Sequence, residues 1–561
     1  MKVGIGIQDF AKIREEDVFY VDKTNFIKEW WENKDDTTLI TRPRRFGKTL
    51  NLSMLTCFFS NKYTGRSDLF EGLSIWNEEA YRKLQGTYPV IFLSFASIKT
   101  GDIESIKTGI KLIIARIYNE NHYLKEDLSD AEQAMFESIN PEMSDAVAVN
   151  SINLLAEFME KYYGKKVLIF LDEYDTPMQE AWITGNWDET VSFFRMFFNA
   201  TFKTNPHLER GLITGITRIS KESIFSDLNH LEVVTTTSNK YATCFGFTEN
   251  EVFASLDTAG LSSEKQQVKQ WYDGFTFGNY SEIYNPWSII KFLSEQGKYD
   301  TYWADTSSNG LVSTLIQRGS ADIKQTFEEL LNGKCLETEL DEQIIFNQLD
   351  KNESAIWSLL LATGYLRVER FMQVGVFQKK IYTLKLTNME VMLMFAKMIT
   401  GWFQESGSSY NQFIKALLMG DVDSMNEFMN EIALQSFSSF DTAKNASQKD
   451  DPERFYHGFV LGMMVDLEGR FAVTSNKESG FGRYDIMLEP VNKLQDNAYI
   501  IEFKVHKPGR EKSIEETAVN ALAQIEEKAY ETALAAKGFA PEKIRKYGFA
   551  FEGIKCLIKE G

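Results

Sequence analysis

Two carboxylates and a lysine near the C-terminus have the types and the spacing of a metal-dependent hydrolytic site. We expect Asp485 to end one strand and residues 499–504 (YIIEFK) to form the next. Side chains alternate between the two faces of a strand, so Glu502 and Lys504 share one side and the residues beside them face the core. Carboxylates from neighbouring strands, here Asp485 and Glu502, can hold Mg²⁺, which takes few protein ligands and keeps several waters. Lys504 can orient or help deprotonate the attacking water, so these residues predict phosphodiester hydrolysis.

The same residues also fit a simpler interpretation, in which they lie solvated on the outer face of an antiparallel sheet. Their surroundings resemble the PD-(D/E)XK nuclease superfamily, in the branch found behind an ATPase-like module in many bacterial proteins. The resemblance rests on residues 456–458 (YHG), 478–485 (ESGFGRYD), 502–504 (EFK) and 523–530 (AQIEEKAY). It implies an αβββαβ core in which the same three residues are catalytic and Gln524 is accessory. Glu453 or Glu478 could supply a further acid, and Glu478 ranks below Asp485 because its neighbours are typical of a loop.

A second, independent signal lies near the N-terminus, where a short apolar strand, a loop and an apolar helix follow one another. They are residues 38–41 (TLIT), 42–49 (RPRRFGKT) and 50–59. The backbone N–H groups of such a loop attract phosphate, Lys48 reaches the β- and γ-phosphates, and the Thr49 hydroxyl meets Mg²⁺. Arg42 stands where the pattern GxxxxGK[ST] has its first glycine, so the residues alone leave a tight basic turn as an alternative.

An acidic strand further along the chain supports nucleotide binding. Residues 166–173 (KVLIFLDE) are typical of a buried central parallel strand with a polar carboxyl end. Asp172 could position the Mg²⁺ water shell, and Glu173 could activate the attacking water. The alternative is a core strand followed by a turn. Together, the loop and the acidic strand favour an NTPase.

A series of short motifs occurs in the order found in the AAA-ATPase-like family that precedes this type of nuclease. They are residues 20–24 (YVDKT), 42–49 (RPRRFGKT), 171–175 (LDEYD), 215–220 (GITRIS), 271–275 (WYDGF) and 284–288 (YNPWS). The resemblance implies that the arginine-rich loop is the family's own phosphate loop. The residues around the nucleotide would be Arg44, Arg45, Phe46, Gly47, Lys48, Thr49, Asp172 and Arg218. Arg218 falls where such ATPases sense the γ-phosphate, and a surface arginine capping a strand is the equal alternative.

Composition describes an ordinary soluble globular protein, because 43% of the residues are hydrophobic and 25% are charged. The 561 residues are too many for one core and indicate about three to five units. Four cysteines without paired spacing indicate neither zinc nor disulfides. The N-terminus lacks the apolar core of a signal peptide, and no apolar run approaches the roughly 20 residues that span a bilayer. We therefore expect a cytoplasmic protein outside the membrane.

The net charge of −19 argues against extensive contact with nucleic acid, because nucleic-acid binders usually show a basic surface. A local basic run, residues 504–512 (KVHKPGREK), adjoins the predicted catalytic strand. It could contact DNA, or it could be a solvated loop. We expect nucleic acid, with DNA as the anticipated polymer, to bind weakly or transiently, or with help from a partner.

We predict an α/β fold with a P-loop NTPase parallel sheet, a middle region with a helical lid and a winged-helix-like unit, and a C-terminal restriction-endonuclease-like αβββαβ domain. The predicted domains are residues 1–245, 246–437 and 453–561, with a polar linker at 438–452. The parallel sheet is predicted from strands at residues 38–41, 88–95, 167–172 and 212–217. Thr248 and Glu251 predict a capping box, and helical periodicity dominates from there to about Leu434.

Our functional hypothesis is a module that binds and hydrolyses ATP and controls a nuclease dependent on Mg²⁺ or Mn²⁺. The intact set of Asp485, Glu502 and Lys504 favours this hypothesis. In the alternative, nucleotide acts as a switch or assembly signal, and the C-terminal domain binds nucleic acid or protein without cleaving. The negative charge favours the alternative. Both versions allow a homo-oligomer or a regulatory protein partner.

Overall fold

The chain forms two compact units in the computed structural model. The first comprises residues 1–311 and 335–392, and the second comprises residues 312–334 and 393–561. The structure describes residues 2–219, 224–225, 228, 230–303, 312, 315–316, 321–331, 333–340, 349, 353–375, 378–395, 407–437, 460, 464, 467, 470–479, 482–493, 495–507, 509–552 and 555–561. The predicted boundaries at 245, 437 and 452 stay predictions, and the whole of the predicted linker lies outside the described residues. No helix in the described part of the chain is long and apolar enough to cross a membrane.

A five-stranded parallel sheet forms the centre of the first unit, in the order β2-β3-β4-β1-β5. Its strands are β1 (Thr37–Thr41), β2 (Val90–Ser94), β3 (Val167–Asp172), β4 (Leu208–Gly215) and β5 (Leu231–Val234). β1 and β3 are buried along their whole length, as expected of strands covered on both faces. The four predicted strands are confirmed: β3 has the predicted ends, and the ends of β1, β2 and β4 are shifted. β5 was not predicted, because a four-residue edge strand carries little periodic signal.

The strand order brings the predicted nucleotide-binding residues to one edge of the sheet. β4 lies between β1 and β3, with Thr41 paired to Gly215 and Leu171 paired to Ile213. Because the strands are parallel, their carboxyl ends meet at the same edge, where ligands bind in open α/β sheets. The loop after β1, the acids that end β3 and the segment after β4 therefore share that edge.

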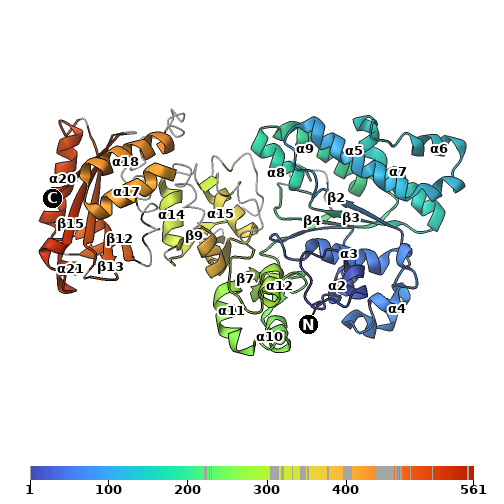
Figure 1. Cartoon of the computed structure of the whole chain (residues 1–561). Coiled ribbons are helices and arrows are strands. Elements are labelled where there is room, and N and C mark those ends of the chain that lie inside the picture. Colours follow the sequence, from blue (N-terminus) through green and yellow to red (C-terminus); the bar gives the residue numbers. More distant parts are fainter. Residues whose placement is uncertain are drawn as a thin grey trace. The chain divides into compact units, whose positions relative to one another are not determined.

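Helices cover both faces of this sheet, with α2, α3 and α4 on one side and α5, α7, α8 and α9 on the other (Figure 1). The helices of this part are α1 (Phe10–Glu15), α2 (Asn25–Asn33), α3 (Lys48–Phe59), α4 (Glu79–Leu84), α5 (Ile103–Glu120), α6 (Asp130–Glu137), α7 (Asp145–Tyr163), α8 (Thr176–Thr184) and α9 (Trp187–Phe198).

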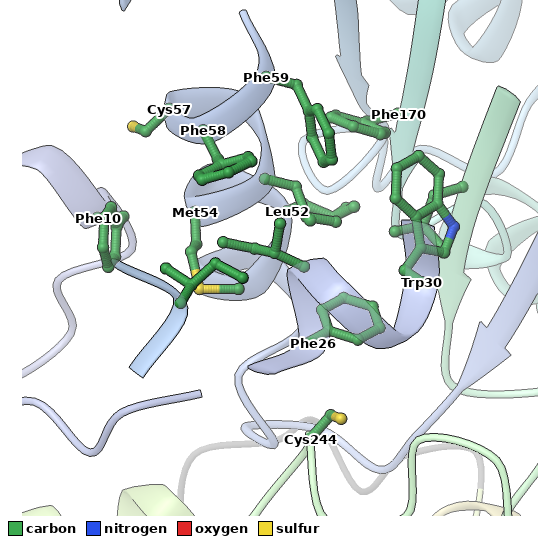
Figure 2. Close-up of a cluster of buried hydrophobic side chains, with 14 of the residues drawn as sticks. Phe10, Phe26, Trp30, Leu52, Met54, Cys57, Phe58, Phe59, Phe170 and Cys244 are labelled. Carbon is green, nitrogen blue, oxygen red and sulfur yellow. The ribbon is translucent and has the colours of Figure 1, made fainter. Parts of the chain in front are cut away.

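Helix α3 begins with the lysine and threonine of the predicted phosphate loop and is buried on most sides. Figure 2 shows Leu52, Met54 and Phe58 of α3 in one cluster with Phe26 and Trp30 of α2. A helix that is apolar all round belongs in the interior of a protein. This packing fixes α3 against the sheet, and so it fixes the start of the helix beside the loop.

Phe58→Ala should lower the free energy of unfolding by about 3–5 kcal/mol, because it truncates a fully buried aromatic side chain. The Phe58 ring centroid lies 5.0 Å from that of Phe59 and 5.1 Å from that of Phe70. Urea unfolding followed by tryptophan fluorescence would measure the loss. Leu112→Ala, at a position 51% exposed, is the control and should change stability by less than about 0.5 kcal/mol. Equal effects of the two substitutions would contradict the buried position of α3.

The lid, which we define as residues 246–303, follows the sheet in the first unit. It contains α10 (Glu249–Thr258), α11 (Lys265–Tyr272), α12 (Pro286–Ser294) and an antiparallel sheet of β6 (Phe247–Thr248), β7 (Phe275–Phe277) and β8 (Tyr280–Tyr284). The predicted capping box is confirmed, since the Thr248 hydroxyl accepts from the Glu251 N–H and the Glu251 carboxylate accepts from the Thr248 N–H. This box begins α10 immediately after β6.

The wing module, which we define as residues 336–339 and 353–388, contains one helix and three strands. They are α15 (Glu353–Ala362), β9 (Leu336–Glu339), β10 (Leu366–Val374) and β11 (Lys379–Leu386). A helix followed by a long hairpin agrees with the predicted winged-helix-like unit. Helices account for more of the described residues from 248 to 434 than strands do, as expected, but the strands β7 to β11 in that range were not predicted. Short strands show too few alternations to stand out against helical neighbours.

A second five-stranded sheet, in the order β12-β13-β14-β15-β16, forms the centre of the second unit. β14 and β15 run parallel, and the other neighbours run antiparallel. The strands are β12 (Phe471–Ser479), β13 (Gly482–Pro490), β14 (Ala498–Val505), β15 (Ile544–Glu552) and β16 (Lys555–Glu560). The helices are α14 (Ala321–Leu331), α17 (Gly407–Met419), α18 (Val422–Phe437), α20 (Ile514–Glu527) and α21 (Thr532–Ala536). The three strands before α20 and the parallel strand after it give the βββαβ part of the predicted core.

Helices pack on both faces of this second sheet. Ile501 and Phe503 of β14 join the core with α17 and α18, whereas Ile500 packs with residues of α20 and α21. Gly548 of β15 faces α20, and a Cβ atom there would lie 2.5 Å from the carbonyl oxygen of Ala518. The missing side chain lets α20 approach the sheet closely. The face of β14 that carries Glu502 and Lys504 therefore lies against α20.

Candidate functional site

The residues predicted for hydrolysis lie together on β13 and β14. The regular pairing of the two strands reaches Ile486 with Ile501, and the next position places Asp485 across from Glu502. The Asp485 carboxylate accepts a hydrogen bond of 2.8 Å from the Phe503 N–H. The prediction that Asp485 ends its strand is wrong, because β13 continues to Pro490 through the alternating residues that pair with β14.

Gln524 of α20 joins the lysine to the second carboxylate. Lys504 Nζ donates to Gln524 Oε1 at 2.6 Å, and Gln524 Nε2 donates to Glu502 Oε1. Glu502 is only 2% exposed, so the alternative of a solvated surface carboxylate is wrong for this residue. The structure thus brings together the four residues predicted for this site, and Gln524 holds two of them.

Tyr530 is a further member of the site that sequence reasoning did not assign. Gln524 Nε2 also donates to the Tyr530 hydroxyl at 3.2 Å. Burial raises the pKa of Tyr530, and the negative charges of Glu502 and Asp485 raise it further. The side chain returns to the site because the chain reverses after α20, where Ala529 has a left-handed backbone with φ of 49°. Helical spacing carries no signal for such a reversal.

The donor set at this site fits a small, hard cation. Mg²⁺ typically binds through one or two carboxylates and retains waters, and Asp485 and Glu502 offer two carboxylates on adjacent strands. In the part of the chain that the structure describes, no group of three or more His, Cys, Asp or Glu residues could hold a metal ion. Glu453, proposed as a further acid, lies outside the described residues, as does the side chain of Glu478.

The basic run after β14 forms the connection to α20. Lys507, Arg510 and Lys512 are exposed, and among the described residues none of the three side chains makes an ion pair. Glu511 instead turns inward, where its carboxylate accepts hydrogen bonds from Thr517 and from Asn520. The three cations therefore face solvent in the connection that follows the strand of Glu502 and Lys504.

The first unit contains a cavity of about 450 Å³ at the predicted nucleotide site. Its walls are the phosphate loop with Glu173, the N-terminal segment from Gly4 to Lys23, and the lid residues Trp287 and Ile290. Lys48 Nζ donates to the carbonyls of Arg42 at 2.9 Å and Pro43 at 2.8 Å. Burial lowers the pKa of the Lys48 ammonium. The lysine is therefore held at the base of the loop.

The predicted Mg²⁺ residues of the first unit touch directly. Thr49 Oγ1 donates to Asp172 Oδ2 at 2.6 Å, and Thr214 Oγ1 of β4 donates to Asp172 Oδ1 at the same distance. Asp172 is 1% exposed, and burial raises the pKa of its carboxyl against the effect of these two hydrogen bonds. A hydroxyl beside a carboxylate at the start of a phosphate-binding helix fits Mg²⁺ and its waters.

Glu173 lies on the cavity wall and has a left-handed backbone, with φ of 51°. Its carboxylate accepts a hydrogen bond of 3.2 Å from Thr176. Asp175, two residues further along the motif, is structural: its carboxylate accepts from the N–H groups of Ile216 and Thr217, at 3.0 and 2.8 Å. Sequence reasoning assigned no role to Asp175.

Arg218 follows the segment that Asp175 holds, and it is half-buried. It is absent from the described residues that line the cavity. The structure therefore does not bring Arg218 to the cavity wall, and its role as a γ-phosphate sensor stays a prediction.

Arg42 occupies the position of the usual first glycine as a fully buried residue. Its guanidinium donates to the carbonyls of Thr41, Thr235 and Lys240, at 2.9, 2.7 and 3.3 Å. It also lies 4.5 Å from the ring centroid of Phe277 in the lid. Burial lowers the pKa of this guanidinium to about 9. Arg42 thus points away from the cavity and holds the loop from behind.

The other predicted loop residues line the cavity, and two of them also pack against aromatic rings of the lid. Phe46 is 1% exposed, and its ring centroid lies 4.8 Å from that of Phe275. Arg45 stacks its guanidinium 4.4 Å from the Trp287 ring centroid. Gly47 has φ of 79°, a left-handed conformation that favours glycine. With Arg44, these residues line the cavity.

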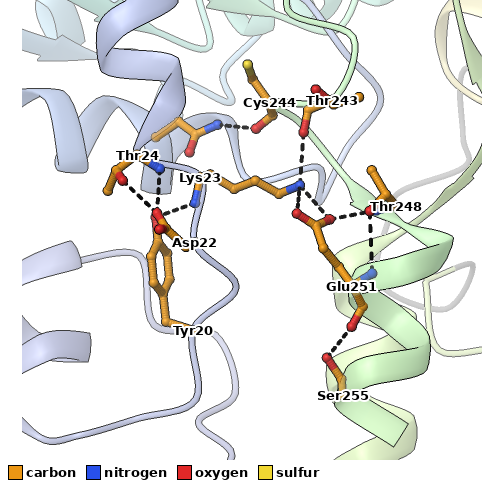
Figure 3. A network of polar contacts seen from close by, with 10 residues as sticks. Tyr20, Asp22, Lys23, Thr24, Thr243, Cys244, Thr248, Glu251 and Ser255 are labelled. Atoms are coloured by element: carbon orange, nitrogen blue, oxygen red, sulfur yellow. Dashed lines mark hydrogen bonds and ion pairs between the residues drawn. The ribbon is translucent and has the colours of Figure 1, made fainter. Parts of the chain in front are cut away.

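A partly buried ion pair joins the N-terminal segment to the lid (Figure 3). Lys23 Nζ lies 2.7 Å from Glu251 Oε2 and donates to the Thr243 carbonyl at 2.9 Å. Glu251 belongs to the capping box of α10, so one carboxylate both starts this helix and binds the lysine. The contact fixes two walls of the cavity against each other.

Comparison with known proteins assigns the nucleotide cavity and the carboxylate site to two different families. Residues 4–225 match the family model described as a predicted AAA-ATPase, and residues 451–561 match that of the PD-(D/E)XK nuclease superfamily. An uncharacterized protein in the vnfD 5′ region of Azotobacter chroococcum mcd 1 is 24% identical over 566 residues, which cover 98% of this chain and 96% of that protein.

A solved structure is similar at a lower level. It is a signal transduction ATPase with numerous domains (STAND) and a tetratricopeptide repeat sensor, from Pyrococcus horikoshii, with 14% identity and a TM-score of 0.22. The match covers 80% of this chain and 54% of that chain, so this chain spans about half of its length. On the two family matches, the chain carries an AAA-ATPase-like domain at residues 4–225 and a PD-(D/E)XK nuclease superfamily domain at residues 451–561.

Proposed function

We propose that this protein binds and hydrolyses ATP and that the ATPase module controls a Mg²⁺-dependent nuclease domain, which cleaves phosphodiesters of nucleic acid. The observation that carries the nuclease proposal is the convergence of Asp485, Glu502, Lys504 and Gln524 at one place on β13, β14 and α20. The test is incubation of the purified protein with single- and double-stranded DNA and RNA. Each substrate is combined with Mg²⁺ or Mn²⁺, and with or without ATP.

Each residue of the carboxylate site has a distinct role in this proposal. Asp485 and Glu502 would hold the cation, which when bound supplies stabilisation of the charge that develops on the phosphodiester. Lys504, fixed by its hydrogen bond to Gln524, would orient the attacking water or take up its proton. Gln524 would hold the side chains of Lys504 and Glu502 in fixed positions relative to each other.

The residues of the cavity support ATP as the nucleotide. Lys48 and the loop backbone would bind the phosphates, and Thr49 with Asp172 would hold Mg²⁺. Glu173, which lines the cavity together with Lys48, would orient or deprotonate the attacking water. Arg44, Arg45 and Gly47 would surround the phosphates, and Arg218 would sense the γ-phosphate.

The exposed cations in the connection after β14 support contact with a nucleic-acid backbone. The net charge of −19 opposes broad binding, so the proposed contact is local and weak, with DNA as the polymer. The proposed setting is the cytoplasm, and a homo-oligomer or a regulatory partner would supply any further affinity.

Arg510→Glu should weaken DNA binding uniformly across sequences, because it reverses one exposed charge next to the catalytic strand. The slope of log Kd against log salt should fall by about 1 for each DNA phosphate that the variant no longer neutralises. Fluorescence anisotropy in EDTA measures binding without cleavage. Lys555→Glu, the same kind of reversal at an exposed position on β16, is the control and should leave affinity near parental. If the two variants changed DNA affinity equally, the prediction that the basic run contacts DNA would be wrong.

The alternative function is a nucleotide-dependent switch or assembly protein whose C-terminal domain binds nucleic acid or protein without cleavage. The net charge of −19 favours it. Binding of DNA with no product under any metal condition would support this alternative, and metal-dependent product that Asp485→Asn removes would reject it.

A further inference from the structure

The phosphate loop is packed into its surroundings on the side away from the cavity. A Cβ atom on Gly364 of the wing module would lie 2.9 Å from Pro43 Cγ, so the loop proline approaches the wing backbone closely. The Phe46 ring contacts Phe275 and Phe277 of the lid. The large residues that replace the usual small ones therefore make contacts that a glycine-rich loop would lack.

One backbone group in the middle of the loop is held by two side chains. The carbonyl of Arg44 accepts from Trp303 Nε1–H at 3.1 Å and from Asn285 Nδ2–H at 3.3 Å. Asn285 is fully buried and also caps α12, because its side-chain carbonyl accepts from the N–H groups that begin the helix. Both donors lie in the lid. The position of Arg44 is thus set by lid residues.

Glu390 connects these donors to the end of the wing module. It is fully buried, and its carboxylate accepts from the Trp303 N–H at 2.6 Å and from the Ser288 hydroxyl at 2.8 Å. Buried hydrogen bonds such as these are costly to break, because each partner would then be left unsatisfied away from water. Tyr365 of the wing module lies 5.3 Å from the Trp303 ring, centroid to centroid. Movement of the wing module would therefore carry Trp303, and with it the Arg44 carbonyl.

We propose that Trp303, Asn285 and Glu390 are positioning residues that couple the phosphate loop to the wing module, so that ATP binding is transmitted to the wing. The inference rests on the proposed ATP binding. A triphosphate would draw Lys48 Nζ from the Arg42 and Pro43 carbonyls, and the loop backbone would adjust. Coupling is reciprocal, so the position of the wing also sets ATP affinity.

Two conservative variants test the link. Trp303→Phe keeps a ring but loses the donor to the Arg44 carbonyl, and Asn285→Asp keeps a cap for α12 but loses the other donor. The control is Trp271→Phe, in the lid helix α11, where the ring packs on Tyr299 at 5.3 Å. The readout is hydrogen exchange of the full chain with and without ATP and Mg²⁺.

In the parent protein, ATP should slow exchange both in peptides of the phosphate loop and in peptides of residues 353–388. Trp303→Phe and Asn285→Asp should keep the first protection and lose the second, whereas Trp271→Phe should keep both. Loop protection without wing protection in the parent, or wing protection that survives in both variants, would overturn the coupling. Absence of loop protection in the parent would instead overturn ATP binding itself, and the coupling with it. If one variant fails to fold, the other decides.

Discussion

Asp485→Asn and Lys504→Ala should each abolish metal-dependent cleavage of nucleic acid and leave ATP binding at the parental level. The two substitutions act in the second unit, whereas the residues of the nucleotide cavity all belong to the first. Loss of a general acid or base typically lowers a rate by about 10²–10⁴-fold, and loss of a carboxylate ligand should cost at least as much. Product formation from labelled DNA and RNA would measure the effect.

Metal affinity separates the two roles. Asp485→Asn removes a ligand charge, so calorimetry with Mn²⁺ should show weaker binding. Lys504→Ala leaves both carboxylates and the Gln524 contact to Glu502, so its Mn²⁺ affinity should stay near parental. Glu489→Gln, farther along β13 from the site, is the matched control and should retain both cleavage and metal binding. If both site variants cut nucleic acid at the parental rate, the catalytic assignment is wrong and the non-cleaving alternative takes its place.

Lys48→Ala should weaken ATP binding strongly without unfolding the chain. Its ammonium is the buried cation at the base of the phosphate loop, where it now bonds two loop carbonyls. Without this ammonium, the β- and γ-phosphates lose a positively charged partner, and the loop carbonyls lose their hydrogen-bond donor. Titration with a fluorescent ATP analogue measures affinity, and circular dichroism checks the fold. Parental affinity in a folded variant would reject this residue as the phosphate ligand.

Glu173→Gln should keep ATP affinity and slow hydrolysis by about 10²–10⁴-fold, because it removes only the proposed base. Steady-state phosphate release measures turnover. Glu180→Gln makes the same chemical change elsewhere on the cavity wall and should leave turnover near parental. Unchanged turnover in Glu173→Gln would give that glutamate a structural role.

Strand periodicity was sufficient to place Glu502 and Lys504 on one face, since alternation depends only on the local backbone. It could not reveal that this face is covered. The burial of Glu502 comes from α20, and the close approach of α20 depends on Gly548 in a later strand. Such contacts join residues distant in sequence, and no local pattern encodes them. The same reason explains why Tyr530 was not assigned.

The phosphate loop shows the same limit at the other site. Residue types predicted a phosphate-binding lysine and threonine at its end, and the structure places both at the cavity. Arg42 could be judged only as a departure from a pattern, because its partners Thr235 and Lys240 lie after β5, the strand that was missed. The structural role of Arg42 could therefore be recognised only from the tertiary fold.

The left-handed backbone of Glu173 brings protein stability and the proposed rate of ATP hydrolysis into conflict at a single position. A residue with a side chain held at φ of 51° costs about 1–3 kcal/mol, which glycine would not incur. Selection for heat resistance alone would therefore favour glycine there, and the group removed would be the proposed hydrolytic base. On the proposed role of Glu173, glycine at this position would make the protein more stable and its ATP hydrolysis slower.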